Sequence, residues 1–319
     1  MSRALVNNTI ERKYEKVTKI ERILAATRFE RVDRIPKGEF HLEDDLIAEL
    51  LNLKDTVTFK DRVEACELCG LDALAFSPPF SQPDKAKVWE GIKLWRKETD
   101  FFIFAIIDGP FQGTAKLFTS FTDYLLAIAK HDPLLPELVA KSVAANVKLG
   151  LNALASGANG IIVADDIAYQ GGTFISPAAL RKDFFPSLAE QVEVLSGQNA
   201  PVFFHADGNL LPIIDDIINL GVNGLHSLDF ASLADIAKVR LATKNKLCLM
   251  GGYDLAWFEE DNRTDKALQL LTATSLESME SGYIFGSSAG ILGSIQGANK
   301  VLDVYQYVNN LSVGNYGYR

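Results

Sequence analysis

The stretch from Ala200 to Phe230 constrains the fold of this chain more than any other part of the sequence. It contains two apolar runs, VFF and GL, which end at His205 and His226, and a helix-length segment separates them. A strand, a helix and a second strand in this order form a parallel crossover, so both strands end at the same edge of one sheet. We therefore expect the two histidines to lie side by side at that edge.

The same alternation of strands and helices runs along most of the chain. The expected strands are Lys37–Phe40, Asp72–Phe76, Phe101–Asp108, Gly160–Asp166, Val202–Ala206, Gly224–Leu228, Leu247–Gly251 and Tyr283–Ser287. Alternation of this kind implies a parallel sheet, and eight units favour closure into a (β/α)8 TIM barrel. No linker rich in Pro, Gly or Ser interrupts the pattern, so residues 1–319 are expected to form a single domain.

Two additions to the barrel are expected. Apolar residues at helical spacing over Lys16–Arg28 predict a helix before the first strand, which is an N-terminal extension. The segment Lys87–Arg96, KVWEGIKLWR, alternates around a Glu-Gly pair and predicts a small hairpin inserted after the second strand.

Composition excludes several classes of function. The net charge of −9 and the isoelectric point near 5.1 argue against a nucleic-acid partner, because phosphate binding needs clustered Lys and Arg. The polar N-terminal segment and the lack of a long apolar run predict a cytoplasmic protein without a membrane span. Three cysteines fit a reducing compartment, and Cys66 and Cys69 are predicted to face the core from one helix rather than bind a metal.

The active site of such a barrel lies at the C-terminal ends of its strands. His205 and His226 arrive there with carboxylates beside them, and Zn²⁺ prefers such nitrogen and oxygen ligands. We expect these two histidines to bind zinc, with Asp207 or another carboxylate of the rim completing the set. The alternative is that the histidines only make hydrogen bonds. Of the adjacent pair Asp165 and Asp166, at most one can face the pocket, because successive residues point to opposite sides.

Several segments together resemble the uroporphyrinogen decarboxylase superfamily, which includes cobalamin-dependent methyltransferases. They are RVDRIP near the first strand, ADDIAYQGGTFISPAALRKDFFPSL after the fourth, FFHADGN at the fifth, GVNGLHSLD at the sixth and LMGGYD at the seventh. The resemblance covers roughly Lys16 to Asn309 and implies the barrel fold with an active site in its mouth.

The motifs that differ between branches of the superfamily indicate which branch this chain resembles most. Decarboxylases carry arginines after the first strand for a substrate with many carboxylates, whereas this chain reads KGEFHLED there. The thiol-directed methyltransferases bind zinc through His-x-Cys and a distant cysteine, but here His205 is followed by Ala206 and Asp207, and the last loop reads GSSAG. The H-x-D-G-N signature is most similar to the corrinoid-linked methyltransferases of O-demethylase systems.

This resemblance implies a zinc methyltransferase that moves a methyl group between a small methylated substrate and a corrinoid. The substrate is expected to be an aromatic methyl ether or a methylated amine, and the corrinoid (cobalamin) to come on a separate protein, since the chain lacks DxHxxG. The alternatives are a tetrapyrrole decarboxylase and a non-catalytic barrel that binds a small molecule or a corrinoid. The candidate residues are Asp108, Asp166 and Tyr253 for catalysis, His41, Phe76, Tyr169 and Asp254 for substrate, and His205, His226 and Asp207 for metal.

Overall fold

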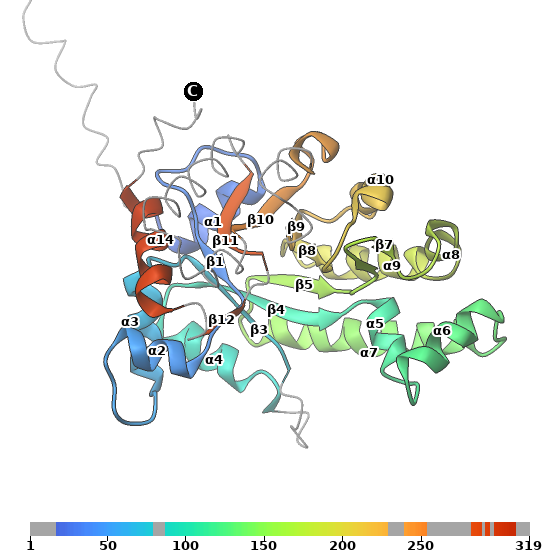
Figure 1. The fold of residues 1–319 in the computed structure, drawn as a ribbon, viewed down its shortest axis with the longest axis horizontal. Coiled ribbons are helices and arrows are strands. Elements are labelled where there is room, and N and C mark those ends of the chain that lie inside the picture. Colours follow the sequence, from blue (N-terminus) through green and yellow to red (C-terminus); the bar gives the residue numbers. More distant parts are fainter. Residues whose placement is uncertain are drawn as a thin grey trace, which may run out of the picture.

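Eight parallel strands form a nearly closed barrel in the computed structural model, which describes residues 17–78, 87–228, 239–253, 282–288, 291–293 and 297–310 (Figure 1). In spatial order the strands are β1 (Gly38–Glu39), β3 (Ala73–Phe76), β4 (Phe102–Asp108), β5 (Gly160–Ala164), β8 (Val202–His205), β9 (Gly224–His226), β10 (Cys248–Tyr253) and β11 (Tyr283–Ser287). The ends of the sheet meet at a parallel bridge between Lys37 and Phe285, where the Phe285 N–H donates to the Pro36 carbonyl at 2.8 Å. The eight expected strands and the TIM-barrel fold are confirmed.

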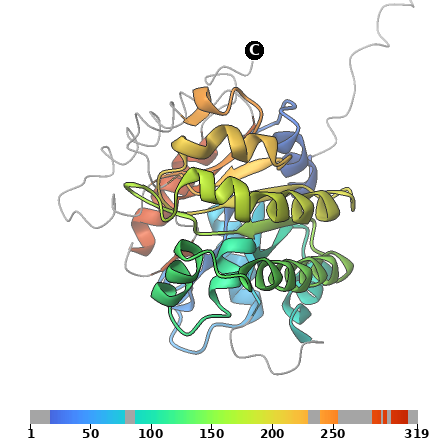
Figure 2. The ribbon, with the colours of Figure 1, turned by 90° about the vertical axis from the view of Figure 1, so that its right-hand side faces the viewer.

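Helices surround the strands (Figure 2). They are α1 (Lys19–Thr27), α2 (Asp44–Leu50), α3 (Phe59–Cys69), α4 (Glu90–Glu98), α5 (Pro110–Ala115), α6 (Phe121–Ala129), α7 (Leu135–Ala155), α8 (Pro177–Asp183), α9 (Phe185–Ser196), α10 (Ile214–Asn219) after the short 3₁₀ helix η2 (Leu211–Ile213), and α14 (Ala298–Asn310). Two small ladders complete the fold, β2 (His41–Leu42) with β12 (Ile291–Leu292) and β6 (Ala168–Tyr169) with β7 (Gly172–Thr173). Among the described helices, none has the length and apolar character needed to cross a bilayer.

Local sequence explains where several helices begin. The Thr18 side chain accepts a hydrogen bond from the N–H of Glu21 at 3.1 Å, and the Glu21 carboxylate accepts one from the Thr18 N–H at 2.8 Å, which is a capping box for α1. Ser176 caps α8 by accepting from the N–H of Ala179 at 3.2 Å, and Pro177 occupies the first helical position. The N-terminal helical extension is confirmed by α1.

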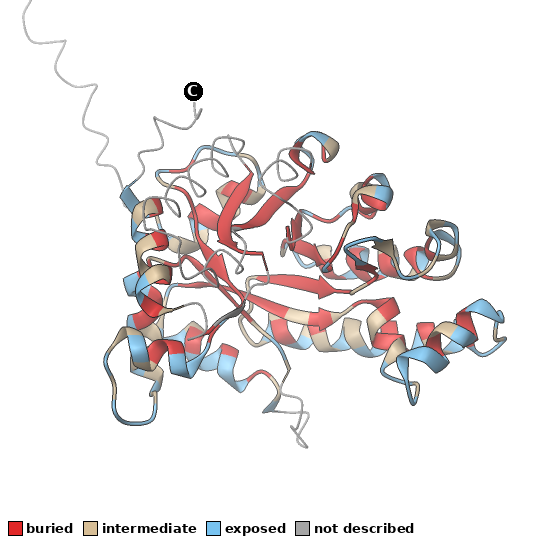
Figure 3. Cartoon of the chain, viewed as in Figure 1, coloured by how far each residue is buried: buried red, intermediate tan, exposed pale blue. Residues whose placement is uncertain are grey.

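The core has two shells that follow the alternation of the strands. Phe104, Ile162 and Phe203 are buried inside the barrel, while their neighbours Ile103 and Ile161 are buried between the strands and the helices. The strands are accordingly buried almost throughout, whereas the helices expose their outer faces (Figure 3). A parallel barrel covered by helices requires this pattern, because its strands have no solvent-facing side.

The predicted hairpin at Lys87–Arg96 is wrong, since the structure has helix α4 there. Trp89, Ile92 and Trp95 are buried, and their spacing of three residues places them on one helical face. Gly91, taken as a turn residue, lies on the exposed side of this helix, where a glycine is tolerated.

The Cys-x-x-Cys pair of α3 belongs to the core, as expected. Cys66 and Cys69 are both buried, and burial raises the pKa of the Cys69 thiol to about 12. Thiols held in this protonated form are poor metal ligands and poor nucleophiles.

Candidate metal centre

The two histidines of the central crossover meet at the mouth of the barrel. The register of β8 and β9 pairs His205 with His226, and their Nδ1 atoms lie 2.8 Å apart. A hydrogen bond between two ring nitrogens requires one N–H and one lone pair. Burial, followed by the charge of His205, lowers the pKa of His226 well below its usual value, although the nearby backbone of Ser287 acts in the opposite direction. His226 is therefore neutral at pH 7.

The neutral state of His226 restricts the tautomers of the pair. Its Nε2 makes no hydrogen bond that meets distance and angle criteria with the described residues. Either ring can supply the N–H of the bond between the two Nδ1 atoms, and when His205 supplies it, Nε2 of His205 carries the lone pair that a metal ion requires.

Phe40 packs against both imidazole rings. Its ring stacks on His226 with centroids 4.2 Å apart at 23°, and it meets His205 edge to face at 5.2 Å. Phe40 follows β1 directly and is itself buried, so the end of β1 forms a wall behind the histidine pair.

One group of donor atoms has the composition of a metal site. Nε2 of His205 lies 3.9 Å from Oδ1 of Asp166 and 3.9 Å from Oδ1 of Asp207. One ligand atom from each of the three residues falls within 4.8 Å of the others. His205 is nearly buried, whereas the side chains of Asp166 and Asp207 are 44% and 53% exposed, so the group opens toward solvent.

Hydrogen bonds tie together the two loops that carry these carboxylates. The Asp207 N–H donates to Oδ1 of Asp166 at 3.1 Å, which ties the loop after β8 to the loop after β5. The Asp166 N–H donates to Oε1 of Gln112 at 3.1 Å. Helix α5 thus positions Asp166 through a residue that carried no sequence signal for the site.

Asp165 and Asp108 have hydrogen-bond partners outside the donor group. Asp165 is buried and accepts the N–H groups of Phe111 at 3.2 Å and Gln112 at 2.6 Å, so it caps α5. Burial raises the pKa of Asp165 to about 8, despite these two bonds. Asp108 pairs with Lys116, whose Nζ lies 2.7 Å and 2.6 Å from its two carboxylate oxygens. Asp166 is the member of the adjacent pair that faces the rim.

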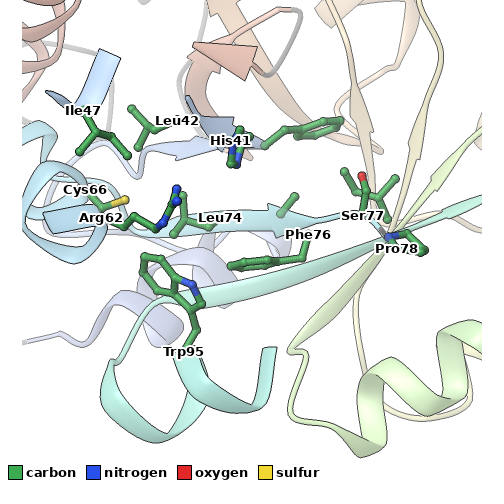
Figure 4. A pocket seen from close by; sticks show the side chains of 13 residues that line it. His41, Leu42, Ile47, Arg62, Cys66, Leu74, Phe76, Ser77, Pro78 and Trp95 are labelled. Atoms are coloured by element: carbon green, nitrogen blue, oxygen red, sulfur yellow. The ribbon is translucent and has the colours of Figure 1, made fainter. Parts of the chain in front are cut away.

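A cavity of about 560 Å³ is lined by the side chains drawn in Figure 4, and among the described residues neither His205 nor His226 belongs to its lining. Its walls include Phe40, His41 and Phe76, two of which were expected to contact substrate. Desolvation, followed by the charge of Arg62, lowers the pKa of His41, although part of this side chain remains exposed. Arg62 also lines the cavity and donates to Asp44 at 2.8 Å. The cavity is mainly apolar and offers hydrogen-bond donors from His41 and Arg62.

Three other residues predicted for the site, Tyr169, Tyr253 and Asp254, are not among the described residues that line the cavity. Tyr169 is 52% exposed and stacks on Phe174 with centroids 5.6 Å apart, outside the lining of the cavity. The backbone of Tyr253 ends β10, but its side chain lies outside the described part of the chain. Asp254 lies outside the described residues altogether.

Comparison with known proteins agrees with this architecture. The family model for uroporphyrinogen decarboxylase (URO-D) matches residues 54–301, which is well over half of the chain. A methyltransferase from Methanosarcina mazei has a similar structure, with a TM-score of 0.72 and 16% identity over 92% of this chain and 99% of that one. An AP endonuclease of family 2 from Brucella melitensis gives a TM-score of 0.49 with 13% identity, covering 81% of this chain and 96% of that one.

The curated proteins offer no significant match to this sequence. The likeness to the methyltransferase, at 16% identity, shows a shared fold alone. The extent of the family match carries the assignment. The chain belongs to the uroporphyrinogen decarboxylase family.

Proposed function

We propose that this protein is a zinc-dependent methyltransferase. It moves a methyl group between a small methylated substrate, such as an aromatic methyl ether, and a corrinoid carried by a separate protein. The observation that carries the proposal is the donor group of His205, Asp166 and Asp207 at the barrel mouth. Membership of the uroporphyrinogen decarboxylase family and the likeness to a protein described as a methyltransferase support it.

The donor group fits a zinc ion. Zinc is bound by His nitrogen and carboxylate oxygen at about 2.0–2.2 Å, so two ligands of a tetrahedral ion lie roughly 3.4 Å apart. The separations of 3.9 Å between His205 and the two aspartates need only small side-chain rotations to reach that value. Two carboxylates and a neutral imidazole also balance the charge of a divalent cation.

The proposed ligand set differs from the sequence prediction in one member. His226 was expected as a ligand, but its Nδ1 faces Nδ1 of His205, and we assign it the role of orienting that ring. Asp166, expected as a catalytic group, is assigned to the metal together with Asp207. A carboxylate bound to zinc does not serve as a general base at the same time.

A bound zinc ion would act as a Lewis acid for the oxygen that leaves when a methyl ether is cleaved, because an alkoxide or phenoxide is otherwise a poor leaving group. The protein's own residues hold the site around this chemistry. His226 orients the His205 ring through the bond between their Nδ1 atoms, and Phe40 covers the inner side of the pair. The exposure of Asp166 and Asp207 leaves the outer side open to a docked partner.

The proposed substrate contacts lie in the cavity and along the rim of the barrel. His41 and Phe76 would contact the methylated substrate from the cavity, and the pair of Asp108 and Lys116 would orient its polar end. Tyr169 would cover the substrate from the rim. Tyr253 and Asp254 retain the roles expected from the sequence, in catalysis and substrate binding.

Decarboxylation of a tetrapyrrole is the second candidate, because the family model bears that description. A porphyrinogen with many carboxylates needs several guanidinium partners. Among the described residues, Arg62 is the sole arginine lining the 560 Å³ cavity, and Asp44 already neutralises it. These contacts favour an uncharged substrate over a polyanion.

Metal analysis tests the ligand assignment. Protein purified without a His-tag is expected to contain about one zinc per chain by plasma mass spectrometry, and His205→Ala is expected to lose it. His226→Ala is expected to weaken zinc binding roughly 10- to 100-fold, as loss of an orienting partner does. His131→Ala serves as the control, because His131 is exposed on the loop between α6 and α7. Zinc below a tenth of an equivalent in the wild-type protein would remove the metal from the proposal.

A spectroscopic assay tests the reaction. A catalyst is expected to change the ultraviolet–visible spectrum of a reduced corrinoid protein when a methoxybenzene is added, and His205→Ala is expected to abolish that change. A non-catalytic binding barrel would leave the spectrum unchanged with every methyl donor. Turnover of uroporphyrinogen in a parallel assay would instead support the decarboxylase.

A further inference from the structure

The first strand of the barrel separates early from its neighbour. β1 pairs with β3 over only two positions. The chain then leaves the barrel wall, because β2 pairs with β12 and not with β3. Among the described residues, the last backbone hydrogen bond between the two segments runs from the Ala75 N–H to the Phe40 carbonyl at 3.3 Å. Beyond this bond, the end of β3 is paired with β4 alone.

The cavity of about 560 Å³ lies where these strands separate. Its lining draws on both shells of the core. Phe40, Ala75 and Ile106 belong to or pack against the apolar cluster inside the barrel. Leu74 and Trp95 belong to the cluster between the strands and the helices. Since Leu74 and Ala75 are successive residues of β3 and point to opposite faces, a cavity that both of them line crosses the barrel wall.

The inner end of the cavity borders the candidate metal centre. Phe40 lines the cavity, and the same ring contacts both His205 and His226. Ile106 packs against the cluster inside the barrel, yet it is only partly buried. The space inside the barrel beside Ile106 is therefore accessible to a small molecule.

The outer end of the cavity lies between β3 and three helices. Ile47 of α2, Cys66 of α3 and Trp95 of α4 line it, and all three are buried. Figure 4 shows Leu42 on one side of this space and Trp95 with Phe76 on the other. The rings of Trp95 and Phe76 have centroids 5.8 Å apart. This end of the cavity suits a flat apolar group.

The size and charge of the cavity restrict what it can hold. An apolar cavity of about 150 Å³ accommodates one benzene molecule, so a cavity of about 560 Å³ has room for more than one ring. Arg62 lines the cavity, but Asp44 pairs with it, and the other walls are mainly apolar. An uncharged molecule therefore fits these walls better than an anion.

We propose that the cavity selects an elongated, uncharged aryl methyl ether with two ring-sized apolar groups. The ring that bears the methyl ether lies inside the barrel beside Phe40, and the second ring lies outside the wall between β3 and the helices. This proposal rests on the proposed function for the reaction, whereas binding of the two rings requires neither metal nor corrinoid. The competing explanation is that the cavity is only a packing void.

Calorimetric titration with two phenols that have no methyl group to transfer tests the binding. The wild-type protein is expected to bind 4-phenylphenol about tenfold more tightly than phenol, because the second ring loses its contact with water. Ile47→Phe and Cys66→Leu fill the outer end from two different helices, and each is expected to bring the ratio of the two affinities close to unity. Leu50→Phe is the matched control on α2, because Leu50 does not line the cavity, and it is expected to leave the ratio unchanged. Urea unfolding of each variant identifies any that fails to fold.

Equal affinities for the two phenols in the wild-type protein would overturn the proposal. A ratio that survives both Ile47→Phe and Cys66→Leu in folded protein would overturn it as well. Methyl transfer from 4-methoxybiphenyl and from methoxybenzene then separates this proposal from the proposed function. Binding as expected without transfer from either ether would leave the two-ring site standing and remove the methyltransferase. Transfer from both ethers with equal kcat/KM, unaffected by Ile47→Phe, would keep the methyltransferase and remove the two-ring site.

Discussion

Lys37 is expected to make this protein more stable as the pH rises from 7 to 9. It is fully buried where the chain enters β1, and its ammonium group contacts the side chain of Asn309. The carboxylate of Asp72 accepts the Lys37 N–H at 3.0 Å, and it also accepts hydrogen bonds from Arg22 at 2.8 Å and Arg34 at 2.7 Å. Burial, followed by the charge of Arg34, lowers the pKa of Lys37 from 10.5 to about 7.

The sign and size of the effect follow from the two protonation states. Below pH 7 the lysine is charged in both the folded and the unfolded chain, and the full cost of burying the charge is present. Between pH 7 and 10.5 the unfolded chain keeps the proton and the folded chain loses it, so the free energy of unfolding rises with pH. The slope approaches 1.4 kcal/mol per pH unit, which gives roughly 2 kcal/mol between pH 7 and pH 9.

Urea unfolding at pH 7, 8 and 9 gives the free energy of unfolding of the wild-type protein and of each variant. The contribution of Lys37 is the difference between their pH dependences. Lys37→Met keeps the length of the side chain without its charge, and is expected to lose the pH-dependent gain of roughly 2 kcal/mol. Lys93→Met is the control, because the side chain of Lys93 is 52% exposed. The reasoning is refuted if Lys37→Met and the wild-type protein show the same pH dependence within about 0.5 kcal/mol per unit. The buried thiols, which titrate at higher pH, are common to all three proteins and cancel.

Three further predictions follow from burial and close contacts. Gly109→Ala is expected to destabilise the protein by about 1–3 kcal/mol in urea, because an added Cβ would lie 2.4 Å from Cγ of Asp165; unchanged stability would contradict the packing. Gly91→Ala in α4 is expected to stabilise it by about 0.5–1 kcal/mol, since an added Cβ meets no atom within 4 Å, and a lowered melting temperature would argue against the helix. The three cysteine thiols are expected to react with Ellman's reagent only after unfolding, because burial raises their pKa; rapid reaction of the native protein would contradict this.

The barrel was predictable because its strands carry the strongest local signal. Segments such as Phe101–Asp108 and Gly160–Asp166 are continuous apolar runs, which parallel strands need when both faces are buried. The segment Lys87–Arg96 was misjudged because a short amphipathic pattern around Glu90 and Gly91 fits either a hairpin or a helix. Packing of Trp89, Ile92 and Trp95 against the core decided for the helix.

The site was only partly predictable. The approach of His205 to His226 followed from the crossover rule, and β8 and β9 pair them in register. The sequence did not show that His205 would be the proposed metal ligand and His226 its orienting partner, because that depends on which ring nitrogens face each other. Neither the contact of Phe40 with both rings nor the bond from Asp166 to Gln112 has a signal in the spacing of residues.

The sequence by itself determined the order of strands and helices. That order places His205, His226 and Asp166 at the C-terminal end of the barrel. Strand periodicity and the handedness of crossovers are local properties, so a single chain reveals them. Only the tertiary structure decided that Asp165 caps α5 while Asp166 joins His205, and that Glu39 on β1 accepts the N–H of Ser287 on β11. These contacts join residues up to 248 positions apart, and their distances depend on side-chain packing within the closed barrel.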